Sequence, residues 1–333
     1  MCSSIPGQPV QCFGESGSYS CELGQSYNSG CSCASCTKVT VSISGTVELL
    51  GTGMSHTCAY VSSGELYCWG NCAHGECGDG TDGESQRAHC GKKRAAIAGP
   101  LSHLALGGQS TCVALKAGGI QCFGIYTAGQ LHNGADNTYP NYGNHRYPNM
   151  VRVGQVDGLT MGHRHACAIL PDFGGVYCWG RNTEGQLGAG NTNPPPWQGR
   201  PLGQSIKALS GNFDFIVSNP TAYFTCAVPT NSNGAVKCWG ENSNGQLGDG
   251  TTVSRLSPIT TNVGGPIQQI VAGSKSVCVL LTSGVMKCWG IVNGQTTPTT
   301  FNAGTKTIKT FTLSRNRLWV YYTDGTWKSC YGF

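Results

Sequence analysis

The chain has 333 residues, only 11% of which are charged, and it contains 50 glycines and 20 cysteines. We take its net charge of +5 as diffuse, because the one basic cluster is Lys92-Lys93-Arg94, which we place in a solvated loop. A diffuse charge argues against nucleic acid as a partner, since that class of protein carries a basic stripe. Helical spacing of apolar residues is almost absent, and no apolar run is long enough for membrane insertion, so we expect an all-β protein.

A hairpin pattern recurs along the chain at intervals of 42 to 60 residues. Its clearest copy, Cys226 to Gly240, reads CAVPTNSNGAVKCWG: an apolar run, a glycine-bearing turn and a second run that ends in Cys-Trp-Gly. The last copy, Val320 to Gly332, has Val320 where the others have their first cysteine. The remaining five copies are Cys2–Gly14, Cys58–Gly70, Cys112–Gly124, Cys167–Gly180 and Cys278–Gly290. Repeats of this length predict a solenoid or a propeller.

Each copy has the physical signature of a β-hairpin. In Cys58–Cys68 the turn falls at Gly64, which allows the positive φ of a short loop, and the flanking residues are β-branched or aromatic. Opposed residues on antiparallel strands have Cα atoms about 4.5–5.5 Å apart, which is close to disulfide geometry. We therefore predict six hairpin disulfides: Cys2–Cys12, Cys58–Cys68, Cys112–Cys122, Cys167–Cys178, Cys226–Cys238 and Cys278–Cys288.

In the best copies the hairpin is followed by N-x-x-G-Q-L-G-x-G, at Asn182–Gly190 and Asn242–Gly250. Together with Cys-Trp-Gly, this sequence resembles the regulator-of-chromosome-condensation repeat. The resemblance implies one seven-bladed β-propeller domain over residues 1–333, with insertions at 15–37 and 71–94. It implies little about function, because propellers serve unrelated tasks. The family's nuclear exchange-factor role conflicts with a chain so rich in paired cysteines.

In chain order, the segments between hairpins each end in a strand. Val39–Gly53 supplies two strands, and we assign Ile206–Ser210 and Ile267–Ala272 to the inner edge of the blade that follows each of them. Seven hairpins and six such segments leave the ring two strands short, one at each end of the chain. Three explanations stay open: irregular terminal strands close the ring imperfectly, the sequence is trimmed, or a neighbouring molecule donates the missing edge. A head-to-tail contact of that kind that does not close makes a filament.

Eight cysteines lie outside the hairpin pairs. An even number allows four further disulfides of unknown connectivity, within the chain or between molecules. Zinc binding is a weaker alternative in a chain of paired cysteines. One candidate is a four-thiolate site in the first insertion, and the other is Cys72-x-His74-x-x-Cys77 with His89 and Cys90. The eight are Cys21, Cys31, Cys33, Cys36, Cys72, Cys77, Cys90 and Cys330. So many cysteines indicate an oxidising, extracellular or cell-surface location, although Met1–Ser4 shows no signal-peptide pattern.

No residue set in the chain has the pattern of a catalytic site. His56 and His165 precede the first hairpin cysteine, a repeat position that indicates a strand-end hydrogen bond. Asp79 and Asp249 recur within glycine-rich turns, which is turn chemistry. We expect neither an enzyme nor a cofactor.

Two classes of function remain. The first is an extracellular structural protein that assembles into a filament or surface layer through its incomplete terminal blades. The second is a secreted binding module, a protein inhibitor or lectin-like adhesin with a protein or glycan partner. Its candidate binding face is a set of aromatic loop residues, since Tyr and Trp dominate binding hot spots: Tyr126, Tyr139, Tyr142, Tyr147 and Trp197.

Overall fold

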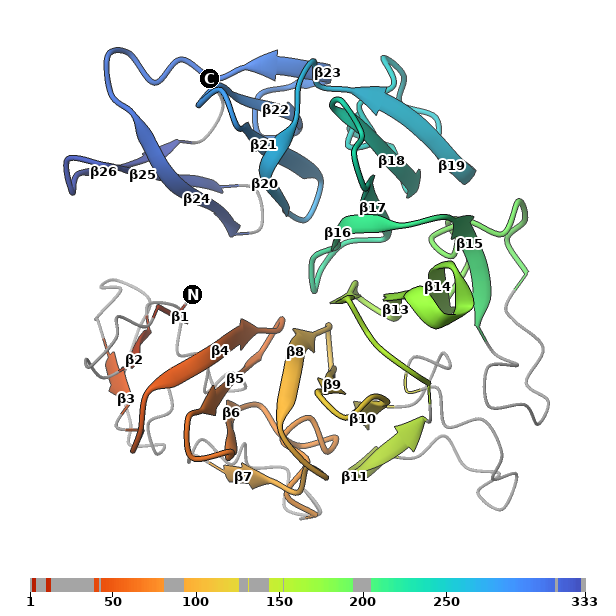
Figure 1. Ribbon diagram of the computed structural model, residues 1–333, viewed down its shortest axis with the longest axis vertical. Helices are drawn as coiled ribbons and strands as arrows, with labels where there is room; N and C mark the ends of the chain where they lie inside the picture. Colours follow the sequence, from red (N-terminus) through yellow and green to blue (C-terminus); the bar gives the residue numbers. More distant parts are fainter. Residues whose placement is uncertain are drawn as a thin grey trace. The chain divides into compact units, whose positions relative to one another are not determined.

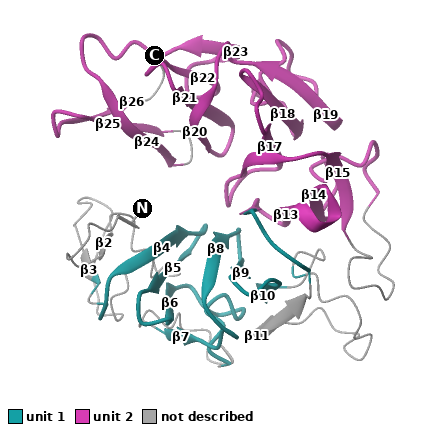
Figure 2. Cartoon of the chain, in the orientation of Figure 1, with its two compact units in different colours: residues 1–159, 196–204 teal, residues 160–195, 205–333 magenta. Residues whose placement is uncertain are grey.

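The computed structural model describes residues 2–3, 10–12, 39–41, 43–80, 93–125, 131, 144–151, 153–193, 205–314 and 317–330. For 2–3, 10–12, 39–40 and 144–151 it describes the backbone alone. The described residues are antiparallel strands joined by turns, with one single-turn 3-10 helix, η1 (Pro171–Phe173) (Figure 1). Within these residues no helix has the length and apolar character needed to cross a membrane. The chain divides into two compact units: residues 1–159 with 196–204, and residues 160–195 with 205–333 (Figure 2).

The first unit holds three sheets, and in each of them strands pair in chain order. Alternating β-branched and aromatic residues form the strands, and glycines in the left-handed region close the turns, such as Gly64 with a φ of +87°. The strands are β1 (Cys2–Ser3), β2 (Val10–Cys12), β3 (Val39–Val41); β4 (Val47–Thr52), β5 (His56–Val61), β6 (Leu66–Gly70), β7 (Lys93–Ala95); β8 (Leu101–Leu106), β9 (Ser110–Leu115), β10 (Ile120–Ile125), β11 (Asn144–Val151).

The second unit holds three four-stranded sheets and a final three-stranded sheet; the first of its strands, β12, begins at the boundary. The strands are β12 (Gly158–Met161), β13 (His165–Leu170), β14 (Gly175–Gly180), β15 (Ile206–Ser210); β16 (Phe213–Val217), β17 (Phe224–Pro229), β18 (Ala235–Gly240), β19 (Arg255–Asn262); β20 (Ile267–Ala272), β21 (Ser276–Leu281), β22 (Met286–Gly290), β23 (Gln295–Thr300); β24 (Ile308–Ser314), β25 (Arg317–Tyr322), β26 (Trp327–Cys330).

The sheets are propeller blades, but the expected count of seven blades is not what the structure shows. Six sheets, from β4 to β26, form blades, and the N-terminal sheet consists of strands of only two or three residues. Among the residues that the structure describes, the predicted shortage of strands falls at both ends, where β1–β3 and β24–β26 each have three strands. Those two sheets are the incomplete members of the repeat.

Two assignments from the sequence are wrong. Ile206–Ser210 is β15, which pairs with β14 and so ends its own blade instead of starting the next one. Lys93 and Arg94 lie in strand β7, not in a loop, and form ion pairs with Asp79 and Glu65. Both strands follow long insertions, in which periodicity gives no information on where a strand pairs.

Within each unit, the core lies between successive sheets. The hairpin cysteines and the residues beside them on the same face of one sheet pack against the following sheet. In the second unit, Cys226 and Val228 pack with Val277, Val279 and Trp289 of the next blade. A β-sheet with one buried face must cover it with a neighbouring layer, and here the covering layer is the next repeat. We call the face that carries the cysteine positions the disulfide face.

Candidate functional site

The structure joins five of the six predicted hairpin pairs. Their Cα atoms are 4.1–4.2 Å apart: Cys58–Cys68, Cys112–Cys122, Cys167–Cys178, Cys226–Cys238 and Cys278–Cys288. Cys2 and Cys12 are register partners in β1 and β2, but their side chains lie outside the described residues. A sixth disulfide, Cys72–Cys77, leaves neither sulfur as a thiolate for the zinc site considered above.

The other cysteines follow no common pattern. Cys21, Cys31, Cys33, Cys36 and Cys90 lie outside the described residues. Cys330 carries a free thiol that is buried beside Leu318, Val320 and Met286. A buried thiol of this kind is not placed to form a disulfide with another molecule.

The last hairpin does not have the register that its sequence suggested. The pairing sets Trp319 opposite Ser329 and Leu318 opposite Cys330. In the second hairpin Gly64 donates its N–H to the carbonyl of Val61, and in the last one Gly325 does the same to Tyr322. Counting back from the turn, Trp319 and Ser329 take the places of Cys58 and Cys68. The prediction that Val320 replaces the first cysteine is therefore wrong by one residue, which moves every side chain to the opposite face.

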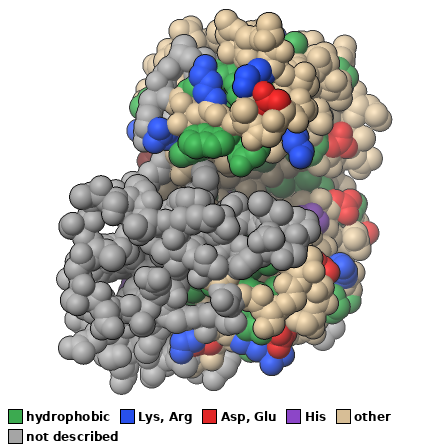
Figure 3. All heavy atoms as spheres, turned by 90° about the vertical axis from the view of Figure 1, so that its left-hand side faces the viewer, with side chains coloured by type: hydrophobic (Ala, Val, Ile, Leu, Met, Phe, Trp, Pro, Cys, Tyr) green, Lys and Arg blue, Asp and Glu red, His purple; other side chains and the backbone are tan. Residues whose placement is uncertain are grey.

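This shift exposes an aromatic surface at the end of the chain. Trp319, Tyr321, Trp327 and Ser329 occupy the disulfide face of β24–β26, and we call them the C-terminal aromatic face. Tyr321 is 51% exposed and Trp327 is 57% exposed, whereas Leu280 and Met286, which hold the same positions one blade earlier, are each 1% exposed. On the side of the molecule that carries β24–β26, hydrophobic side chains lie at the surface among lysine and arginine side chains (Figure 3).

Ring contacts fix the geometry of this surface. The rings of Trp319 and Trp327 lie 5.2 Å apart at 35°. The Arg317 guanidinium lies 4.9 Å from the centre of the Trp319 ring and donates a hydrogen bond to Ser329 Oγ (2.8 Å). Cation–π and aromatic contacts of this kind hold large side chains rigid, and rigid exposed aromatics lose little entropy on binding. The surface is suited to binding a macromolecule.

The buried histidines have a structural role. Thr111 Oγ1 donates to the carbonyl of Glu76 (3.0 Å) and therefore accepts from His56 Nε2 (2.8 Å). His165 Nε2 contacts Thr225 Oγ1 at 2.8 Å in the same way. Burial lowers the pKa of both histidines to about 3, so they stay neutral at physiological pH. These are the strand-end hydrogen bonds expected from the repeat position.

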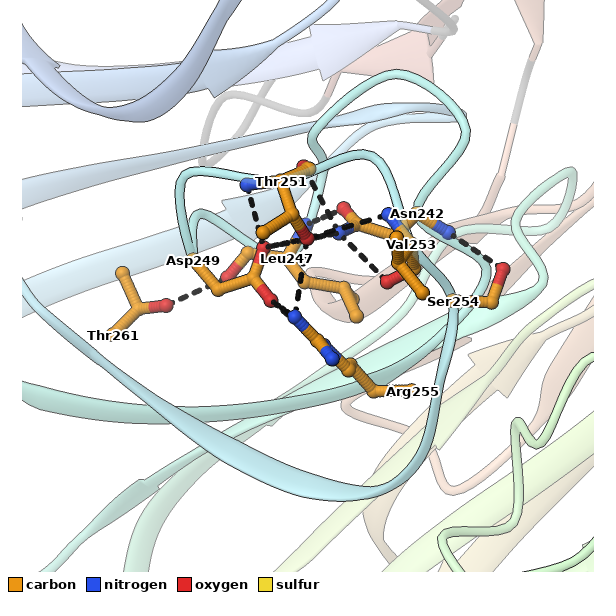
Figure 4. A network of polar contacts seen from close by, with 8 residues as sticks. All are labelled: Asn242, Leu247, Asp249, Thr251, Val253, Ser254, Arg255 and Thr261. Atoms are coloured by element: carbon orange, nitrogen blue, oxygen red, sulfur yellow. Dashed lines mark hydrogen bonds and ion pairs between the residues drawn. The ribbon is translucent and has the colours of Figure 1, made fainter.

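The N-x-x-G-Q-L-G-x-G loop after β18 is held by one buried asparagine (Figure 4). Asn242 Nδ2 donates to the carbonyls of Thr251 and Val253 (3.1 Å each), and its Oδ1 accepts from the N–H of Leu247 (2.9 Å). Asp249 closes the loop through an ion pair with Arg255. Burial alone would raise the pKa of Asp249, but hydrogen bonds from Thr251, Arg255 and Asn242 lower it below its ordinary value. This is turn chemistry, as predicted.

Two of the Cys-Trp-Gly tryptophans donate hydrogen bonds to a neighbouring blade. In the second unit, Trp239 Nε1 donates to the carbonyl of Gln186 (2.8 Å), and Trp289 Nε1 donates to that of Gln246 (2.9 Å). Gly248, with a φ of +75°, lies under the Trp289 ring, where a Cβ would come within 2.8 Å of Nε1. The prediction that these tryptophans are structural is confirmed, since Trp69, Trp179, Trp239 and Trp289 are all at most 2% exposed.

The aromatic loops predicted as a binding face lie outside the described residues. Tyr126, Tyr139, Tyr142 and Trp197 are not described, and β11 is described for its backbone alone, without the Tyr147 side chain. The sequence analysis missed the C-terminal aromatic face because it placed Val320 one position too early in the repeat. The spacing of Gly325 to Cys330, one residue longer than that of Gly64 to Cys68, was the available signal.

The fold and the surface define a class of protein: an all-β propeller whose hairpins are closed by disulfides and which exposes an aromatic face. Residues 174–228 and 233–280 match the model of the "Regulator of chromosome condensation (RCC1) repeat", and residues 156–186 match a second model of the same description. The chain therefore carries RCC1 repeats and has an RCC1-type β-propeller fold.

Two curated proteins and one solved structure show what this chain is similar to. The human "Probable E3 ubiquitin-protein ligase HERC4" is 29% identical over 216 residues, which are 62% of this chain and 18% of that protein. The "Ultraviolet-B receptor UVR8" of Arabidopsis thaliana is 31% identical over 224 residues, 64% of this chain and 45% of UVR8. The structure of Prp20p from Saccharomyces cerevisiae, described with its binding to Gsp1p and histones, has a TM-score of 0.71 at 16% identity, covering 97% of this chain and 81% of Prp20p. The chain spans less than half the length of either curated relative.

Proposed function

We propose that this protein is a non-enzymatic, extracellular interaction protein that associates with further copies of itself through its terminal sheets. The observation that supports this most is the exposure of the C-terminal aromatic face. In the preceding blade the equivalent positions are buried against the following sheet. Exposed Trp and Tyr side chains on a rigid sheet are typical of protein-binding surfaces. Prp20p, which shares the fold, binds other proteins.

The cysteines support an oxidising location for this assembly. Six disulfides join cysteines in the described residues, and proteins kept in reducing compartments rarely hold such bonds. A mass measurement after alkylation, without reductant, tests this on the protein as it is isolated from its natural source. We expect the twelve cysteines of these pairs to remain unmodified; alkylation of most of them would contradict an extracellular location.

The native mass of the full chain tests self-association. Light scattering after size exclusion, over a range of concentrations and with or without reductant, should show species larger than the 34.9 kDa chain. A 34.9 kDa species under all conditions would refute self-association and return attention to a separate partner, as for an inhibitor or adhesin. Oligomers that dissociate only when reductant is added would show that disulfides between molecules hold them together.

A further inference from the structure

Two arginines of the second unit lie side by side at the ends of the β13–β14 hairpin. Arg164 directly precedes β13, Arg181 directly follows β14, and the N–H of Arg181 donates to the carbonyl of Arg164 (2.8 Å). The same backbone bond joins the corresponding residues of four other blades: Ser55 with Asn71, Gln109 with Ile125, Tyr223 with Glu241, and Lys275 with Ile291. Among these five described pairs, only that of β13 and β14 consists of two cationic side chains.

The residue after β14 or β18 contacts the following blade. Glu241 forms an ion pair with Lys275 (3.7 Å), so the two charges of that contact offset each other. Arg181 meets Tyr223 instead: its guanidinium lies 5.4 Å from the centre of the ring, and its Nε donates to Thr183 Oγ1 (2.7 Å). A tyrosine ring attracts a guanidinium but does not neutralise it. Arg181 is therefore held in place with its positive charge uncompensated.

The guanidinium of Arg164 has a donor without an acceptor. Its Nε is buried and has no hydrogen-bond partner. Within the described residues neither Arg164 nor Arg181 forms an ion pair, and this includes Glu184, the acidic residue nearest to Arg181 along the chain. An unpaired guanidinium N–H that is buried costs free energy, and an anion that accepts from it recovers that cost.

His163 shows that the two arginine charges act on one place. Its ring lies edge-on to that of Tyr223, with the ring centres 5.2 Å apart. Burial is the main cause that lowers the pKa of His163; the charges of Arg164 and Arg181 lower it further, and the carbonyl of Pro220 opposes them. His163 is therefore neutral at physiological pH. An anion bound to both arginines would offset their charges and raise the pKa of His163.

We propose that Arg164 and Arg181 bind a doubly charged oxyanion, a sulfate or phosphate group, at the end of the β13–β14 hairpin. Two guanidinium groups match such a group in charge, and each donates several N–H groups in a planar fork that fits its oxygens. Because Thr183 occupies Nε of Arg181, the Nη groups of this arginine make the contact. The inference is independent of the self-association proposed above, since it uses no residue of the C-terminal aromatic face.

Titration of the full chain with inorganic sulfate, and then with inorganic phosphate, tests the site. At constant ionic strength the ring-proton resonance of His163 should shift until the site is saturated, and the pKa of His163 should rise with the bound fraction. Acetate, which has one charge, should bind at least about tenfold more weakly than sulfate. A His163 resonance that neither dianion shifts, or acetate that binds as tightly as sulfate, would overturn the proposal.

The double variant Arg164→Gln/Arg181→Asn removes both guanidinium groups. Gln109 and Asn71 occupy these positions in other blades, so the local fold accommodates both residues, and the unfolding transition checks this. We expect sulfate to bind at least about tenfold more weakly than to wild type, with no rise in the pKa of His163. The native mass of this variant should equal that of wild type, whether or not wild type self-associates.

The matched control is Lys116→Gln/Lys309→Gln, which removes the same charge at two exposed side chains. The control should bind sulfate as wild type does. Equal weakening in both double variants would show that only net charge matters and would overturn the site.

Dextran sulfate and uncharged dextran distinguish a sulfate ester on a glycan from a free ion. Recognition of a sulfated glycan predicts that dextran sulfate binds at least about tenfold more tightly per sulfate than the inorganic ion, and that uncharged dextran does not bind. Recognition of a free ion predicts equal binding per sulfate. In either case Arg164→Gln/Arg181→Asn should weaken the binding; dextran sulfate that binds this variant as tightly as wild type would refute the assignment to these arginines.

Discussion

The loops that follow β6 and β18 have the same backbone but different chemistry. In both, the first loop glycine donates to the carbonyl three residues earlier: Gly75 to Cys72, and Gly245 to Asn242. Where the second loop has Asn242 bound to the N–H of Leu247, the first has Cys72 joined to Cys77. A covalent bond thus takes the place of a hydrogen bond between the same two loop positions, and we call either bond the clip of its loop.

A second difference lies one residue before the clip. Gln246 Oε1 accepts the N–H of Asn244 (2.8 Å), and Glu76 Oε2 accepts that of His74 (2.7 Å). Burial raises the pKa of Glu76 to about 7. The first loop therefore contains a buried titratable group that the second loop lacks.

The largest effect is expected from Asn242→Ala. The substitution removes three hydrogen bonds to backbone groups and leaves buried polar atoms unpaired, so we expect a loss of about 3 kcal/mol in the free energy of unfolding. Denaturant unfolding measures it. Asn244→Ala is the control, because its side chain bonds only to the exposed Ser243; an equal loss in both variants would show that Asn242 is not the clip.

Exchanging one clip for the other tests their equivalence. Cys72→Ser/Cys77→Ser should lose about 2 kcal/mol, the chain-entropy value for a short closed loop. Cys72→Asn/Cys77→Leu should recover most of that loss, since it recreates the Asn242–Leu247 pair. Urea midpoints of both variants decide the matter, and a double variant with Asn and Leu as unstable as the serine variant would refute equivalence.

Glu76→Gln should change how stability depends on pH. The pKa of Glu76 is about 7 in the folded chain and 4.5 when unfolded, so ionisation favours unfolding as pH rises from 4.5 to 7. The variant should gain about 3 kcal/mol over wild type at pH 8 and almost nothing at pH 4. The buried histidines destabilise the fold as pH falls below 6.5, but equally in both proteins. Thermal midpoints across this range give the difference, with the exposed Glu48→Gln as control; a constant difference would contradict the account.

The smallest effect concerns the hydrogen bond between blades. Trp289→Phe leaves the Gln246 carbonyl without its donor, and Val277 across the strand pair has no hydroxyl to replace it. In Trp239→Phe, Thr225 stands opposite and is placed to donate to Gln186, as Thr111 opposite Phe123 does to Glu76. We therefore expect Trp289→Phe to be less stable than Trp239→Phe by about 1 kcal/mol. Equal losses would show that the threonine does not substitute.

The sequence predicts what is local and repeated. Two cysteines ten residues apart around a glycine turn, such as Cys58 and Cys68, predict the hairpin, the register of its strands and its disulfide at the same time. The missing strands at both ends follow from counting. The last hairpin fails because Trp319 and Ser329 carry no cysteine signal, and a one-residue error in register reverses the face of every side chain. The pairing of Ile206–Ser210 fails because a long insertion precedes it, and strand partners depend on tertiary contacts.

The placement of the disulfides has a mechanical consequence. Each of the six described bonds closes a loop within one repeat, whereas the contacts between repeats named above are non-covalent: apolar packing and hydrogen bonds such as those of Trp239, Trp289 and His165. Under a pulling force, an oxidised chain would separate repeat by repeat while each hairpin stayed folded on itself. A hairpin bond between cysteines ten residues apart, such as Cys58–Cys68, withholds roughly 35 Å of extension, at about 3.5 Å per residue. Under tension, such a chain would extend in short steps in an oxidising medium and in longer steps once its disulfides were reduced.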